Sequence, residues 1–136
     1  MVKTADDETS IRVLVADDRE PARRGVEALL STFEGIEVIG SAIDGREAVQ
    51  LAGSDYPDLV LMDGLMPVLD GLEATSRIKK RHPEIGVVVF SVYGHLAAAA
   101  QSAGADAFLI KGCSGAELEA TLREVVSRFR PSSEIE

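Results

Sequence analysis

The segment Asp58-Leu59-Val60-Leu61-Met62-Asp63 places four consecutive apolar residues between two aspartates. An unbroken apolar run of this length is typical of a strand that is buried on both faces. The runs at 11–16 and 86–90 are nearly as apolar, and the first is rich in β-branched residues. Three such runs in one chain predict a parallel sheet with helices packed on both of its faces.

Two further apolar runs, at 36–40 and 107–110, bring the number of expected strands to five. Helical segments separate the strands, and three of these segments begin with a capping residue placed three positions before a glutamate. The three capping pairs are Asp44 with Glu47, Asp70 with Glu73, and Ser114 with Glu117. Five strand–helix units in about 120 residues predict an α/β fold with a five-stranded, doubly wound parallel sheet. Among the few arrangements that right-handed crossovers allow, we expect the flavodoxin-like strand order 2-1-3-4-5.

The length of 136 residues fits one domain. We expect this domain at 11–130, with polar tails at 1–10 and 131–136, the second of which reads like the start of a linker. A net charge of −9 argues against nucleic-acid binding by the chain itself. The sequence has no apolar run of the roughly 20 residues that a membrane span needs, and its acidic N-terminus is no secretory signal. These features predict a cytoplasmic protein without membrane contact.

Charged and hydroxyl side chains follow four of the expected strands at their carboxyl ends. Asp17 and Asp18 follow the first strand, Asp63 the third, Ser91 the fourth and Lys111 the fifth. These four strands are neighbours in the expected order, and ligands of open α/β sheets bind at this edge. We therefore expect the five side chains to meet in one place.

Three carboxylates at one point have an electrostatic consequence. Two of them ~4 Å apart repel by about 4 kcal/mol at an effective dielectric constant of about 20. A third carboxylate would raise the pKa values further or require a cation, and Lys111 can neutralise only one charge. The arrangement predicts a hard divalent cation with oxygen ligands, most simply Mg²⁺.

Each of these residues also has a structural interpretation when it is taken singly. Asp18 is suited to cap the helix that follows Arg19, Asp17 to be a solvated loop acid, and Asp63 to cap a loop. Ser91 and Lys111 are residue types that are more often structural or solvated than functional. Their joint position at one sheet edge favours a site.

The same residues resemble the receiver domains of bacterial two-component response regulators, especially the receivers of helix-turn-helix transcriptional regulators. The resemblance covers residues 11–130, and receivers share the expected strand order, so the two expectations are not independent. It rests on Val13-Leu14-Val15-Ala16-Asp17-Asp18 followed by Arg23 or Arg24, on 58–67 with Asp70-Gly71, on Ser91, and on the run 103–111 that ends in Lys111.

The resemblance implies a role for each matching residue. Asp63 would be the nucleophile that accepts a phosphoryl group from a sensor histidine kinase. Asp17, Asp18, Asp63 and the backbone carbonyl of Leu65 would hold Mg²⁺, with Asp18 as the more direct ligand and Asp17 acting through water. Lys111 would neutralise the phosphoryl oxygens.

The resemblance also implies a switch. Ser91 would swing toward the phosphoryl group and Phe108 would move inward. The surface formed by the fourth helix, the fifth strand and the fifth helix would then change, control an output such as transcription, and offer a face for a homodimer. The chain would be a signalling domain rather than an enzyme, although it takes part chemically in its own phosphorylation and dephosphorylation. The bulk of Leu65 and Tyr93 beside the site predicts slow self-dephosphorylation.

Two other functions compete with this interpretation. A Mg²⁺-dependent phosphatase of the haloacid-dehalogenase type also uses an aspartate nucleophile, but its motif is Asp-x-Asp, whereas Asp17 and Asp18 are adjacent here. A flavodoxin would need a hydroxyl-rich phosphate loop after the first strand, and the acidic run at 17–20 would repel that phosphate.

Overall fold

The computed structural model describes residues 10–130, so the expected tails at 1–10 and 131–136 lie outside the described residues except for Ser10. The described strands are all parallel and lie in the order β2-β1-β3-β4-β5, which confirms the expected topology. Their bounds are β1 Ile11–Ala16, β2 Ile36–Ala42, β3 Leu59–Asp63, β4 Gly86–Ser91 and β5 Ala107–Ile110. Strand β2 runs two residues beyond the expected 36–40, because Ser41 and Ala42 still pair with β1.

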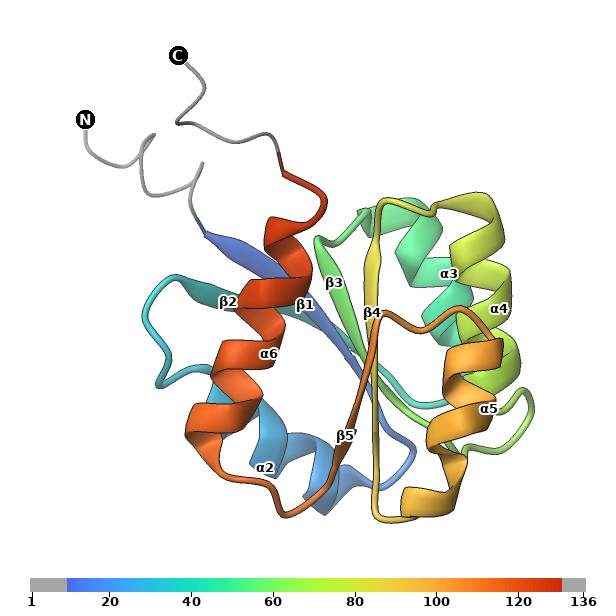
Figure 1. Ribbon diagram of the computed structural model, residues 1–136, viewed down its shortest axis with the longest axis horizontal. Helices are drawn as coiled ribbons and strands as arrows, with labels where there is room; N and C mark the ends of the chain where they lie inside the picture. The colour runs from blue at the N-terminus through green and yellow to red at the C-terminus, as the bar shows by residue number, and fades with distance from the viewer. Residues whose placement is uncertain (1–9, 131–136) are drawn as a thin grey trace.

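Helices cover both faces of this sheet (Figure 1). Their bounds are α2 Glu20–Leu30, α3 Gly45–Asp55, α4 Gly71–Arg81, α5 Ala97–Ser102 and α6 Gly115–Ser127, with a 3₁₀ turn, η1, at Gly94–Leu96. Helices α2 and α6 lie on one face, and α3, α4 and α5 lie on the other. None of the helices within residues 10–130 is long and apolar enough to cross a membrane.

Alternate residues of the central strands pack into two separate hydrophobic cores, one on each face of the sheet. Val13, Val15 and Leu61 pack with α2 and α6, whereas Leu14 and Val60 pack with α3 and α4. Both sets are nearly inaccessible to solvent. This two-sided burial is why the strands read as continuous apolar runs rather than as alternating ones.

The three capping residues stand where the sequence pattern predicts them. The side chains of Asp44, Asp70 and Ser114 each accept a hydrogen bond from the backbone N–H three residues later. They fix the starts of α3, α4 and α6. The start of α4 is the important one here, because it determines how the chain returns after Asp63.

Candidate functional site

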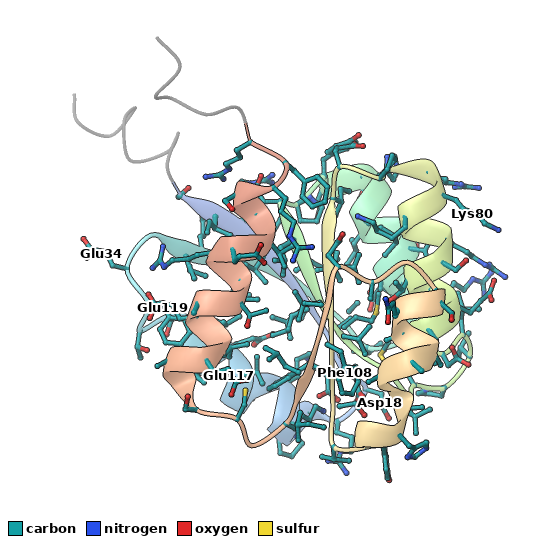
Figure 2. The ribbon with its side chains drawn as sticks, viewed as in Figure 1. Asp18, Glu34, Lys80, Phe108, Glu117 and Glu119 are labelled. Carbon is teal, nitrogen blue, oxygen red and sulfur yellow. The ribbon has the colours of Figure 1, made fainter. Side chains whose placement is uncertain are left out.

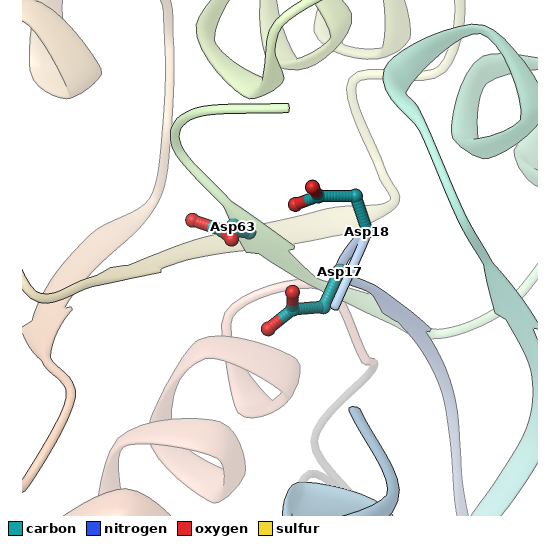
Figure 3. Close-up of side chains that lie close together, drawn as sticks. All are labelled: Asp17, Asp18 and Asp63. Atoms are coloured by element: carbon teal, nitrogen blue, oxygen red, sulfur yellow. The ribbon is translucent and has the colours of Figure 1, made fainter. Parts of the chain in front are cut away.

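Asp17, Asp18 and Asp63 meet at the carboxyl ends of β1 and β3. One carboxylate oxygen from each lies within 4.8 Å of the others. Figure 3 shows the three side chains directed toward the same side of the two strands. Strands β1 and β3 pair directly, with Ala16 opposite Met62, so the residues that follow them are brought together by the register of the sheet.

Asp17 is the most deeply placed of the three, with 3% of its surface exposed. Its Oδ1 accepts the backbone N–H of Arg19 at 2.9 Å, and its Oδ2 accepts the Lys111 ammonium at 2.8 Å. The guanidinium of Arg23 donates to its backbone carbonyl at 3.0 Å. Asp17 is thus not a solvated loop acid. Both of its carboxylate oxygens are already occupied.

Asp18 has the opposite environment, since it is exposed and makes no side-chain hydrogen bond within residues 10–130. The residue that caps α2 is Arg19, and that helix start has no side-chain cap bond, so the capping interpretation of Asp18 is wrong. Figure 2 places Asp18 at the lower edge of the sheet in that view. Its carboxylate is free to bind a ligand.

Asp63 is the last residue of β3, and its side chain is 12% exposed. Its Oδ2 lies 3.4 Å from the Lys111 ammonium, and its Oδ1 accepts the Leu65 N–H at 3.3 Å. Burial raises the pKa of the Asp63 carboxyl, and the charge of Asp17 adds to that rise, while Lys111 works against both. By formal charge, the three carboxylates carry more negative charge than the one lysine beside them.

Gly71 allows the loop after Asp63 to fold back on itself. A Cβ at Gly71 would lie 1.8 Å from the backbone carbonyl oxygen of Asp63, and the Gly71 N–H donates to the carbonyl of Gly64 at 3.1 Å. The pair Asp70-Gly71 belonged to the sequence resemblance, but the close approach that requires glycine depends on the folded loop.

A shallow depression of about 170 Å³ lies in front of these groups. Seven residues line it: Asp18, Arg19, Asp63, Leu65, Val92, Tyr93 and Lys111. Leu65, Val92 and Tyr93 are about half exposed and form an apolar part of the rim. Asp18 and Arg19 are exposed as well, whereas the side chains of Asp63 and Lys111 lie deeper. Sequence reasoning did not single out Arg19 or Val92. Their only sequence signal is that each directly follows a residue expected in the site.

Ser91 and Phe108 lie outside that lining. Ser91 is buried at the end of β4, where its hydroxyl oxygen accepts the Tyr93 N–H at 3.1 Å and its carbonyl accepts the Lys111 N–H at 2.8 Å. Phe108 is half-buried on β5 and lines a separate cavity of about 270 Å³ beneath α5, together with Ala97 and Ala100.

The donor set at this edge can hold a cation. Its oxygen atoms come from three carboxylates within 4.8 Å of one another, and Asp18 offers its side chain without a protein partner. Hard divalent ions prefer such ligands, and an ion here would offset the negative charge that Lys111 alone leaves unbalanced.

Comparison with known proteins places the chain in a family. Residues 13–123 match the family model of the response regulator receiver domain. The chain is 38% identical over 117 residues to the response regulator protein VraR of Staphylococcus epidermidis, an alignment that covers 85% of this chain and 56% of VraR. It therefore spans about half the length of the curated relatives that it matches.

Solved structures agree in fold. The response regulator domain of Thermotoga maritima CheB is 31% identical, with a TM-score of 0.79 over 87% of this chain and 97% of that one. A LuxR-family two-component response regulator from Aurantimonas is 28% identical, with a TM-score of 0.83 over 92% and 91% of the two chains. With a matching sequence model over most of its length, the chain belongs to the response regulator receiver domains.

Proposed function

We propose that this domain accepts a phosphoryl group on Asp63 from a sensor histidine kinase. The phosphorylated domain thereby controls an output, for which transcription is the simplest choice. The observation that carries the proposal is the position of Asp63, whose carboxylate lies in an open depression beside Lys111 and within reach of two further aspartates. A carboxylate in this position is a suitable nucleophile for phosphoryl transfer, which depends mainly on positioning and charge neutralisation.

The metal in this proposal is Mg²⁺, held by Asp18, Asp63 and the backbone carbonyl of Leu65, with Asp17 acting through water. The occupied oxygens of Asp17 and the free carboxylate of Asp18 support this division of roles. A bound Mg²⁺ would neutralise charge on the transferring phosphoryl oxygens. Asp63 contributes the attacking oxygen, and Lys111, 3.4 Å from it, contributes a second positive charge.

The switch in this proposal runs through Ser91 and Phe108. A phosphoryl group on Asp63 adds oxygens that accept strong hydrogen bonds, so the Ser91 hydroxyl turns from its contact with the Tyr93 N–H and donates to them. Phe108 then moves into the hollow beneath α5. The small alanine side chains of α5 leave this hollow open. The surface of α5, β5 and α6 changes as a result and is also the proposed homodimer face.

We propose residues 11–130 as the receiver unit and 131–136 as the start of a linker. The relatives named VraR extend well beyond the matched region, which supports an output domain in the whole protein. We assign no direct nucleic-acid binding to this domain, which is acidic overall. The chain takes part in its own phosphorylation without being a classical enzyme.

The test is incubation with acetyl phosphate, with and without Mg²⁺, followed by intact-protein mass spectrometry. We expect one added phosphoryl group that depends on Mg²⁺ and is lost in Asp63→Asn. Rapid multiple-turnover release of phosphate from diverse esters would instead favour the phosphatase alternative.

A further inference from the structure

Arg19 lies at the mouth of the charged depression and takes no part in the proposed phosphoryl transfer described above. It lines the depression together with Asp18, Asp63 and Lys111. Its backbone N–H donates to Asp17 Oδ1 at 2.9 Å, which fixes the residue directly beside the carboxylates. Arg19 is exposed, so its guanidinium is accessible to solvent beside the depression.

The guanidinium of Arg19 is also uncommitted. Within residues 10–130 it makes no ion pair, whereas its neighbours on α2 are engaged: Arg23 donates to the Asp17 carbonyl and Arg24 pairs with Glu20 at 2.8 Å. Because Glu20 is held by Arg24, the acid next to Arg19 does not neutralise it. The depression thus keeps one positive charge that no described side chain balances.

The charge of Arg19 determines the sign of the net charge of the site when a divalent cation is bound. One divalent cation together with Lys111 would balance the three carboxylates and leave the site neutral. Arg19 then makes the depression positive toward an incoming ligand. Attraction between unlike charges at such a mouth raises the rate of encounter and is weakened by salt.

We infer that Arg19 makes the site selective for phosphodonors of high negative charge, by supplying the net positive charge of the metal-loaded depression. The inference rests on the proposed function of Asp63 as phosphoacceptor. In the reaction with acetyl phosphate, an Asp63 oxygen forms a bond to phosphorus, the bond from phosphorus to the acetate oxygen breaks, and acetate leaves with the electron pair. With phosphoramidate the phosphorus–nitrogen bond breaks, and ammonia leaves with the electron pair.

The two donors separate charge selection from a general defect. Acetyl phosphate is a dianion near neutral pH and phosphoramidate is a monoanion. In Mg²⁺ at low ionic strength, Arg19→Gln should slow modification by acetyl phosphate by about three- to ten-fold. The interaction energy with a monoanion is half as large, so modification by phosphoramidate should slow by only about two- to three-fold.

Two matched variants serve as controls. Arg46→Gln removes the same charge from another exposed arginine, which lines a different depression at the start of α3, and should leave the ratio of the two rates unchanged. Arg19→Lys keeps the charge and should retain the wild-type ratio. Raising the ionic strength to about 1 M shortens the screening length to about 3 Å and should remove most of the difference between Arg19→Gln and wild type.

The outcomes are distinct. Equal slowing with both donors, an equal effect of Arg46→Gln, or an effect that persists at high salt would overturn the role of Arg19 while leaving Asp63 as the phosphoacceptor. A wild-type chain that neither donor modifies in Mg²⁺ would overturn the proposed function and this inference together.

Discussion

Lys111 lies closer to Asp17 than to Asp63. Its ammonium nitrogen is 2.8 Å from Asp17 Oδ2 and 3.4 Å from Asp63 Oδ2, and the Lys111 side chain is 15% exposed. The buried Asp17 therefore holds the lysine beside Asp63. In the proposed function, Lys111 would contact an oxygen of the phosphoryl group on Asp63.

Lys111→Ala tests this arrangement. The variant leaves two poorly solvated carboxylates without their cation, so we expect the metal-free protein to lose about 1–3 kcal/mol of stability. Modification by acetyl phosphate should be slow, and the modified protein should fail to bind its output partner more tightly. Chemical denaturation and a partner-binding assay measure the two effects, and unaltered partner binding would count against the assigned role.

Asp63→Asn should stabilise the metal-free protein at neutral pH. Burial raises the pKa of the Asp63 carboxyl, so the folded state binds its proton more tightly than the unfolded state does. The resulting stability is full below the ordinary aspartate pKa of about 3.9 and is lost as the pH rises through the raised value. The gain in free energy of unfolding from Asp63→Asn should thus grow as the pH rises from about 3.9 through the raised pKa.

Thermal unfolding at several pH values, with and without Mg²⁺, measures this gain. Asp55→Asn is the matched control, because it removes the same charge from an exposed residue at the end of α3. Mg²⁺ should stabilise the wild type more than Asp63→Asn. A variant that is less stable than the wild type at every pH without metal would contradict the cost of burying the Asp63 carboxylate.

Gly71→Ala should be strongly destabilising, because the added Cβ would lie 1.8 Å from the Asp63 carbonyl oxygen. We expect a loss of about 2–4 kcal/mol and impaired modification of Asp63, since the β3–α4 loop must move. Gly25→Ala is the control: nothing lies within 4 Å of its Cβ position, and alanine in that helix should be neutral or stabilising by up to about 1 kcal/mol. Equal effects in the two variants would show that the close approach does not matter.

Ala97→Leu should fill the hollow in which Phe108 is proposed to move. Ala97 is exposed and lines that hollow, so a larger side chain fits without disturbing the core. Modification of Asp63 should proceed at nearly the wild-type rate, while the change in the environment of the Phe108 ring on beryllofluoride addition, followed by NMR, should shrink. Ala98→Leu, which is also exposed but does not line the hollow, should leave the ring's response intact.

The apolar part of the rim should slow loss of the phosphoryl group. Leu65 and Tyr93 line the depression, and neither carries an amide or a carboxylate that could orient an attacking water. Leu65→Asn should speed dephosphorylation of the modified protein by roughly ten-fold, which is less than the roughly 10²- to 10⁴-fold of general acid–base catalysis because an amide can orient the water but does not take its proton. A wild-type half-life of only seconds would contradict this account of the rim.

Much of the fold was predictable because burial on both faces leaves a direct mark on the sequence. The apolar runs at 11–16, 59–62 and 86–90 located three strands within one residue of their observed ends. The site followed from asking which side chains stand at the carboxyl ends of neighbouring strands. Asp17, Asp18 and Asp63 are found together as expected, and Lys111 contacts two of them.

The parts that escaped prediction depend on contacts between distant segments. The fit of Gly71 against the Asp63 carbonyl arises only when the loop closes. The 3₁₀ turn at Gly94–Leu96 before α5 and the extra pairing of β2 are set by packing rather than by local propensity. Arg19 was missed because an exposed arginine has no pattern that separates it from solubilising charge.

The most direct measurement is the identity of the modified residue. Treating the acetyl-phosphate-modified protein with borohydride reduces an aspartyl phosphate to homoserine, and peptide mass spectrometry then locates that residue. We predict homoserine at position 63, formed only when Mg²⁺ is present during modification. Homoserine at another aspartate, or equal yield without a divalent cation, would contradict the assignment of Asp63 to a cation-dependent phosphoacceptor site.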